Sequence, residues 1–342
     1  MPATPDYMNY VLDARPEKGS CIDISEGVRW LRMPLPFLLG HINLWLLDDG
    51  DEIAIVDSGL NSAETREHWK KLLEDMSVSQ VIVTHMHPDH VGCAGWLTET
   101  YDAPLTMSRA EYLMCRVLVA DTGKPAPQVG IDFYRSAGFS ESSLSDYAEK
   151  FGGFGRAVSA MPDSFRRMQD GQVLTIGSAD WEIITTSGHC PEHASLLCRE
   201  KNLFIAGDQL LPTISSNVSV WPTEPNANPL QDWLDACHRL QTILPENVIV
   251  LPSHGKPFTG AHGRLQALID EHETGLQKLR ELCKTPQRVI DVFPALFKSR
   301  ITDSNLIMAT GEAIAHLNYL IARGEIIAET SEDGVAWYRL AH

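Results

Sequence analysis

The segment HMHPDH, residues 85–90, gathers four side chains of metal-binding type within six residues. It follows the apolar run VIV at residues 81–83, separated from it only by Thr84, and this run predicts a strand. In an extended chain residues i and i+2 face the same side, so His85 and His87 can both reach one ion. Asp89 and His90 follow the proline turn and point towards a second ion. A His-x-His pair alone is weak evidence, whereas the full pattern strongly indicates a dinuclear metal site.

Three more side chains of the same chemical type follow, each at the end of an apolar run that predicts a strand. They are His189 in TSGHCPEH, Asp208 in LFIAGDQL and His254 in VIVLPSHGKPF. Five imidazoles and two carboxylates complete two metal sites if one carboxylate binds both ions. His193 competes with His189 within the same segment. Cys190 permits a nucleophile or ligand interpretation, but with the metal set complete we favour a small buried side chain.

The elements that must position these residues are predicted from apolar periodicity. Short strands are predicted at 28–33, 42–47, 52–56, 81–83, 172–176, 181–185, 195–198, 203–205 and 248–251, and a helix at 63–76. From about 108 to 165 the pattern changes to helices with glycine breaks and many aromatic residues, which predicts an insertion over one face. The order of strands, helices and strands favours a layered α/β or α+β architecture over a regular parallel βαβ series.

With these motifs in order, the sequence resembles the metallo-β-lactamase-fold hydrolase superfamily over about Val28 to Phe258, including the IVDSG segment at residues 55–59. The resemblance implies an α+β fold, an αββα sandwich in which two stacked sheets are flanked by helices and a dinuclear site lies at the sheet edges. The helical insertion would then cover the metals as a lid. Ordinary helical core is the better interpretation for most of its aromatic residues, while a few, with Met161, would form an apolar acyl channel.

The same resemblance implies a role for each residue of metal-binding type. It places His85, His87 and His189 on the first metal, and Asp89, His90 and His254 on the second, with Asp208 bridging both. The family pattern selects His189 over His193, and it gives Asp57 a structural role behind the ligands. His41, in a loop between early strands, is a weaker candidate for the rim of the site.

The donor set also defines the chemistry that the site can support. Imidazole and carboxylate ligands suit zinc, and the same donors accept iron or manganese. Two ions about 3.5–4 Å apart provide a bridging hydroxide near neutral pH and polarise a bound carbonyl. Asp89 and Asp208 are therefore the predicted catalytic carboxylates. Either Asp89 or a metal-bound water is the candidate for protonating the leaving group.

Individual residues weaken several branches of the superfamily. Asp208 argues against β-lactamase activity, because true β-lactamases with this motif are not expected to carry the bridging aspartate. His87 stands where the flavin-linked diiron oxygen reductases have a glutamate, and long-substrate nucleases usually carry a large inserted domain or a basic exosite. We therefore predict a hydrolase for an ester-like carbonyl, in particular a thioester of acyl-CoA or acyl-glutathione type. The alternatives are a phosphodiesterase or ribonuclease, a lactonase, and a non-catalytic binding protein.

The predicted order of strands and helices changes after about residue 262. A continuous helix is predicted from Leu265 to Cys283, followed by two helices and a β-hairpin. This predicts a linker helix and winged-helix-like module at 263–342, after a hydrolase domain at 1–262 whose lid insertion spans about 108–168. From Thr285 to His342 there are five basic and seven acidic residues, which favours a packing or homodimerisation role over nucleic-acid recognition.

Composition excludes further classes of partner. The 342 residues carry a net charge of −17, which disfavours nucleic acid and anionic membranes and leaves a small-molecule substrate as the expected partner. Seven scattered cysteines without a CxxC pair, and an N-terminus without a signal-peptide pattern, predict a cytoplasmic location. The longest apolar run is broken by two prolines and is too short for a membrane span.

Overall fold

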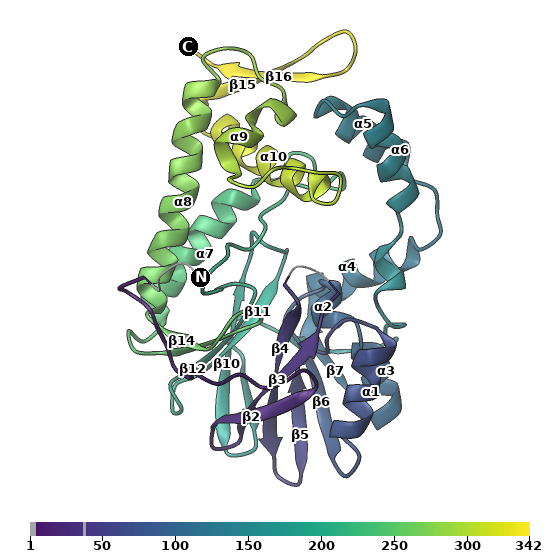
Figure 1. Ribbon diagram of the computed structural model, residues 1–342, viewed down its shortest axis with the longest axis vertical. Coiled ribbons are helices and arrows are strands. Elements are labelled where there is room, and N and C mark those ends of the chain that lie inside the picture. The colour runs from purple at the N-terminus through teal and green to yellow at the C-terminus, as the bar shows by residue number, and fades with distance from the viewer. Residues whose placement is uncertain (1–4, 37–38) are drawn as a thin grey trace.

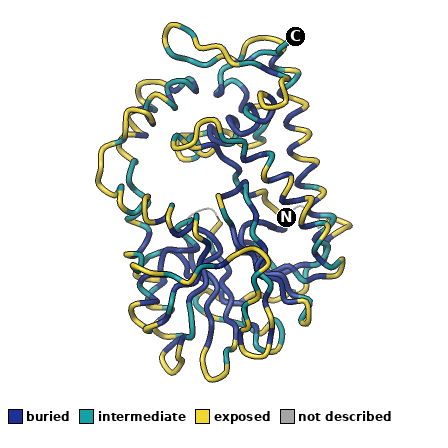
Figure 2. Tube along the Cα trace, turned by 180° about the vertical axis from the view of Figure 1, so that it is seen from behind, coloured by how far each residue is buried: buried dark blue, intermediate teal, exposed yellow. Residues whose placement is uncertain are grey.

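Two seven-stranded sheets pack face to face at the centre of the computed structural model, which describes residues 5–36 and 39–342 (Figure 1). Buried side chains from both sheets fill the space between them, among them Trp30, Trp45 and Trp181. Helices cover the outer faces, so the molecule has the α, β, β, α layers predicted from the sequence. Figure 2 shows that the buried residues are concentrated in these sheets.

The first sheet is built from the N-terminal half of the chain. Its order is β2 (Ser20–Ser25), β3 (Val28–Pro34), β4 (His41–Asp49), β5 (Glu52–Val56), β6 (Ser77–Val83), β7 (Leu105–Ser108) and β8 (Arg166–Met168). The first four strands pair in antiparallel fashion, and β5 to β8 are parallel. In β3, Trp30 faces the second sheet and Leu31 faces the helices, because successive side chains alternate between the two faces.

The second sheet contains the strands that precede the later metal-binding residues. Its order is β1 (Asn9–Tyr10), β14 (Phe258–Thr259), β13 (Ile249–Pro252), β12 (Leu203–Gly207), β11 (His193–Cys198), β10 (Ala179–Thr186) and β9 (Val173–Ile176). Strands β12 and β13 are parallel, while the other pairs are antiparallel. β11 and β12 are buried along their whole length, which agrees with their continuous apolar sequence.

Helices pack on the outer face of each sheet. The first sheet is covered by α1 (Ala63–Leu72) and α3 (Ala94–Tyr101), and the short α2 (Pro88–Val91) carries part of the metal motif. The insertion consists of α4 (Arg109–Ala120), α5 (Gln128–Ser136), α6 (Glu141–Lys150) and the short η1 (Phe154–Arg156). The buried aromatic residues Tyr134, Phe139 and Tyr147 of this insertion share a core cluster with the C-terminal helices. These three are core residues, as the sequence favoured for most of the aromatic set.

The C-terminal region packs against the second sheet through α7 (Pro229–Ile243) and α8 (Ala261–Leu282). It continues through η2 (Val289–Val292), α9 (Phe293–Leu296), α10 (Leu306–Ala322), β15 (Ile326–Thr330) and β16 (Ala336–Leu340). Figure 1 shows α8 along one edge of the molecule, the α4 to α6 arm along the other, and α10 between them. Within the described ranges, no helix has the length and apolarity needed to cross a bilayer.

The sequence predictions hold for the fold class and for most elements, with several differences. The helix predicted to reach residue 76 ends at Leu72, and the strand predicted at 81–83 begins at Ser77. Helix α7 was not predicted. The cavity of about 360 Å³ beside Met161 is lined by residues of α3, residues 103–105 and the 160–164 segment, and not by metal-motif residues. The apolar acyl channel stays a prediction.

Candidate metal centre

The predicted metal-binding residues lie where strands of both sheets end. His85 and the rest of the HMHPDH motif follow β6, Asp208 follows β12 and His254 follows β13, while His189 lies in the connection from β10 to β11. Because β12 and β13 are parallel, as are β5 and β6, their carboxyl ends meet at one edge of each sheet. The fold therefore brings together residues that are more than 150 positions apart in the sequence.

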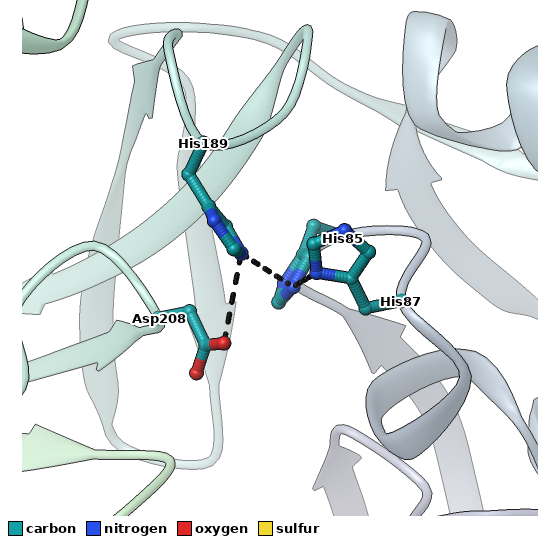
Figure 3. A group of neighbouring side chains, drawn as sticks. All are labelled: His85, His87, His189 and Asp208. Atoms are coloured by element: carbon teal, nitrogen blue, oxygen red, sulfur yellow. Dashed lines mark hydrogen bonds and ion pairs between the residues drawn. The ribbon is translucent and has the colours of Figure 1, made fainter. Parts of the chain in front are cut away.

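The first group of side chains is His85, His87, His189 and Asp208, whose ligand atoms all lie within 4.8 Å of one another (Figure 3). His85 Nε2 lies 2.9 Å from His87 Nδ1 and 3.3 Å from His189 Nε2. His189 Nε2 lies 3.6 Å from Asp208 Oδ2. The three histidines predicted for the first metal thus converge on one point.

The second group is Asp89, His90 and His254, whose ligand atoms meet the same distance limit. Asp89 Oδ2 lies 3.8 Å from His90 Nε2 and 3.4 Å from His254 Nε2. Asp208 also faces this group, since its Oδ1 is 3.4 Å from His90 Nε2 and 3.6 Å from His254 Nε2. One carboxylate therefore presents Oδ2 to the first group and Oδ1 to the second.

Bonds behind the ligands fix which imidazole nitrogen carries a proton. Nδ1 of His189 donates to the carbonyl of Asn217 at 2.7 Å, and Nδ1 of His254 donates to the carbonyl of His41 at 3.0 Å. Because a carbonyl only accepts, both rings must be protonated at Nδ1 when neutral, which leaves Nε2 as a free lone pair. These two Nε2 atoms point into the site.

His85 is held in the same tautomer by a short chain of hydrogen bonds. The hydroxyl of Thr84 donates to the carboxylate of Asp57 at 2.9–3.0 Å, so it accepts from Nδ1 of His85, which lies 3.0 Å away. Nε2 of His85 then carries a lone pair that faces the lone pair of His189 Nε2 at 3.3 Å. Two facing lone pairs repel unless a cation lies between them, so this geometry fits a divalent metal ion.

Buried atoms without partners support the same conclusion for the second group. Among the described residues, His90 Nε2 and Asp208 Oδ1 are buried and have no hydrogen-bond partner. An unpartnered buried polar atom is costly, and a bound cation would satisfy both atoms. The His and Asp donor set fits divalent ions such as zinc.

The charges around the two groups differ. Burial, followed by the neighbouring histidines His90 and His87, holds the pKa of His85 well below its usual value, and burial lowers the pKa of His87 to about 3. Burial also lowers the pKa of His90, but the carboxylates of Asp208, Asp57 and Asp89 outweigh it and raise that pKa well above normal. The imidazoles of His85 and His87 are thus neutral and can bind a metal, whereas the carboxylates around His90 favour positive charge there.

Glu111 on α4 is a functional candidate that sequence reasoning missed. Its fully buried carboxylate accepts the backbone N–H of Met86 at 2.9 Å and that of Glu192 at 2.8 Å. It therefore joins the loop that carries His85 to the loop that carries His189. In the sequence it is an ordinary acidic residue in the first turn of a helix, and nothing marks it.

His193 and Cys190, the other two candidates in the TSGHCPEH segment, lie outside both groups of predicted metal ligands. Nε2 of His193 accepts the backbone N–H of Asp208 at 3.2 Å, so this ring supports the loop from behind. Cys190 is buried, and burial with the nearby carboxylate of Glu111 raises its thiol pKa well above normal. Part of the loop before His41 lies outside the described residues, but the carbonyl of His41 itself orients His254.

Comparison with known proteins defines the class. Residues 38–254 match the Metallo-beta-lactamase superfamily model, so the chain belongs to this family, and it is a hydrolase of that superfamily with a His and Asp site of divalent-metal type. Residues 276–341 match the model of the metallo-beta-lactamase-like C-terminal domain. The predicted C-terminal module is therefore present, and its winged-helix description stays a prediction.

Two of the similar proteins extend over nearly the whole chain, and a third matches about half of it. A probable metallo-hydrolase, YqjP of Bacillus subtilis, is 23% identical over 92% of this chain and 98% of its own length. A beta-lactamase domain protein from Burkholderia ambifaria has a solved structure that matches with a TM-score of 0.89 at 36% identity, covering 98% of both chains. The hydroxyacylglutathione hydrolase GloC of Haemophilus influenzae is 24% identical over 48% of this chain and 63% of its own length.

Proposed function

We propose that this protein is a dinuclear metal-dependent hydrolase of ester-like carbonyls, and that its substrate is a thioester of acyl-CoA or acyl-glutathione type. The observation that carries the dinuclear assignment is the placement of Asp208, whose two oxygens face two separate groups of ligands 3.4–3.6 Å away. The thioester assignment is supported by the similarity to hydroxyacylglutathione hydrolases over part of the chain.

Each ligand has a place in this proposal. His85, His87 and His189 hold the first ion, Asp89, His90 and His254 hold the second, and Asp208 holds both. When bound, two divalent ions, with zinc preferred over iron or manganese, supply an ionised water as nucleophile and a Lewis acid for the carbonyl.

Asp89 is better suited to holding an ion than to protonating the leaving group. Burial raises its pKa, but the neighbouring His90 and His254 outweigh burial and lower it. A general acid works best with a pKa near the working pH, whereas Asp89 stays a carboxylate. We therefore assign Asp89 to the second ion and Asp208 to the bridge.

A lactone is opened by the same attack on a carbonyl, so lactonase activity remains an alternative substrate choice at this site. Phosphodiester or RNA cleavage is disfavoured by charge. The chain carries a net charge of −17, and its region from Thr285 to His342 has more acidic than basic residues. A small molecule is thus the proposed partner. A cytoplasmic location is supported by the seven cysteines, all of which are free thiols.

The test is a substrate panel on zinc-loaded protein. It contains an acyl-CoA, an acyl-glutathione, an aliphatic lactone, an aryl phosphodiester and a short RNA, with the metal-stripped protein as control. We expect the highest kcat/KM on one of the two thioesters and none after metal removal. Cleavage of the phosphodiester or RNA without turnover of any thioester or lactone would overturn the proposal. RNA binding that weakens steeply with salt would favour the nuclease alternative.

A further inference from the structure

A path of hydrogen bonds leads from the metal centre into the C-terminal region. Nδ1 of His189 donates to the backbone carbonyl of Asn217 at 2.7 Å. The side-chain Nδ2 of the same Asn217 donates to Oε2 of Glu312 on α10 at 2.8 Å. The residue that orients a metal ligand is therefore itself held by a carboxylate 95 positions later in the chain.

The amide of Asn217 is fixed at both ends. Its Oδ1 accepts the hydroxyl of Ser219 at 2.5 Å, while its Nδ2 donates to Glu312. This arrangement leaves the amide one orientation that satisfies both partners. The backbone of Asn217, and with it the carbonyl that meets His189, is thus restrained by the side chain of the same residue.

Helix α10 lies tightly against the segment that carries Asn217. The backbone N–H of Val220 donates to the carbonyl of Gly311 at 3.0 Å. A Cβ atom at Gly311 would lie 2.7 Å from the hydroxyl of Ser219, so only glycine permits this approach. The helix position therefore determines where the Asn217 loop lies.

Glu312 is anchored on its other side by two buried histidines. Nδ1 of His316 donates to the backbone carbonyl of Glu312 at 2.8 Å, which leaves Nε2 of His316 as an acceptor. Nδ1 of His272 on α8 lies 3.1 Å from that Nε2 and donates to it. The path thus extends from α8 through α10 to the metal centre.

We propose that Glu312 is a positioning residue of the metal centre, which acts through Asn217 to orient His189 and so makes the C-terminal region part of the first metal site. The residue does not touch the metal ligands. Partners behind a ligand typically change metal affinity by about 10- to 100-fold when removed, and Glu312 stands one step further back. This inference rests on the metal centre alone and does not depend on the substrate.

The alternative is that Glu312 simply helps α10 to pack. Asn318 on the same helix offers a matched control, because its Nδ2 donates to the carbonyls of Pro225 at 3.0 Å and Ala227 at 2.9 Å. Asn318 therefore holds α10 to the segment between β12 and α7, which also carries Asn217, but it does not bond to Asn217 itself. A packing role predicts equal effects of Glu312 and Asn318, whereas a positioning role separates them.

The test measures Zn²⁺ affinity by competition with a chromophoric chelator, with circular dichroism to confirm folding. Glu312→Met fills similar space without an acceptor, and we expect about tenfold weaker binding of Zn²⁺. Glu312→Gln retains an oxygen that accepts from Asn217, so it should bind as the wild type does, and so should Asn318→Ala. Asn217→Ala removes the other end of the bond and is expected to give the same loss as Glu312→Met.

Adding Glu312→Met to Asn217→Ala should cause no further loss, because the two residues act through one bond. The proposal is wrong if Glu312→Met binds Zn²⁺ as the wild type does, if Asn318→Ala causes an equal loss, or if the double variant shows additive losses. Since Zn²⁺ affinity is measured without substrate, a failed thioester assay leaves this result unaffected.

Discussion

Oδ2 of Asp57 lies 2.8 Å from Nδ1 of His90, and both side chains are almost completely buried. Oδ1 of the same carboxylate accepts the backbone N–H of Thr84, the residue before His85, at 2.8 Å. One carboxylate therefore holds both ends of the HMHPDH motif. Asp57 follows β5 with a φ of 60°, a left-handed conformation that aspartate and asparagine tolerate better than most residues.

Asp57→Asn should keep the backbone and weaken the metal centre. The asparagine oxygen can still accept from Thr84, but its NH2 group would face the Nδ1–H of His90, so that ring loses its acceptor. We expect Zn²⁺ affinity to fall by about 10- to 100-fold, measured by chelator competition. Asp102→Asn is the control, because Asp102 also has a positive φ, of 52°, but is exposed and outside the site. Equal affinities of Asp57→Asn and wild type would contradict this role.

Asp208→Ala should lower bound metal and hydrolytic activity together. Asp208 is the carboxylate that faces both ligand groups, so its loss removes a ligand from each. Metal content after dialysis, determined by mass spectrometry, is expected to fall from two ions per chain to one or none. The matched control is Asp163→Ala, since the side chain of Asp163 is fully exposed. Two retained ions with full activity in Asp208→Ala would refute the bridging assignment.

The sequence predicts the ligands better than it predicts what holds them. His85, His189, Asp208 and His254 each follow a recognisable apolar run, and a strand end is a local feature. Glu111 has no local signal, because its role arises from backbone groups 25 and 81 residues away. Such a role depends on which distant segments the fold brings together. No short stretch of a single sequence contains that information.

The C-terminal region shows the same limit. Its helices and hairpin follow from periodicity, and α10 and the β15–β16 hairpin correspond to the last helix and the hairpin predicted after Cys283. Its connection to the metal centre does not follow, because the hydrogen bond between Asn217 and Glu312 joins residues 95 positions apart in the sequence. The charge of this region favours a packing role, and that interpretation does not include the connection to His189.

Glu312 should also make the stability of the fold depend on pH. Burial raises its pKa to about 7, against the lowering effect of the Asn217 bond, from an ordinary value of 4.5. Between these two values the folded chain binds more protons than the unfolded chain, so the free energy of unfolding falls as the pH rises. Glu312→Gln removes the free-energy cost of burying an ionised carboxylate. We expect the variant to be more stable than the wild type by about 1–3 kcal/mol at pH 8.5, and by a smaller amount at pH 5.5.

Urea unfolding at both pH values measures this difference in the metal-free protein. Glu329→Gln serves as a control, because Glu329 is exposed on the C-terminal hairpin and pairs with Arg339 on its surface. A stabilisation by Glu312→Gln that is equal at the two pH values would show that the raised pKa is not its cause.

Cys190 lies next to the proposed metal ligand His189, yet it should be dispensable for catalysis. Its thiol is buried, and burial together with the charge of Glu111 raises its pKa well above normal, so the nucleophilic thiolate is not formed near neutral pH. Cys190→Ala is expected to retain hydrolytic activity and bound metal. In the native protein iodoacetamide should modify the partly exposed Cys21 and leave Cys190 untouched, as peptide mass mapping would show. Rapid alkylation of native Cys190, with loss of activity in Cys190→Ala, would instead make this cysteine part of the reaction.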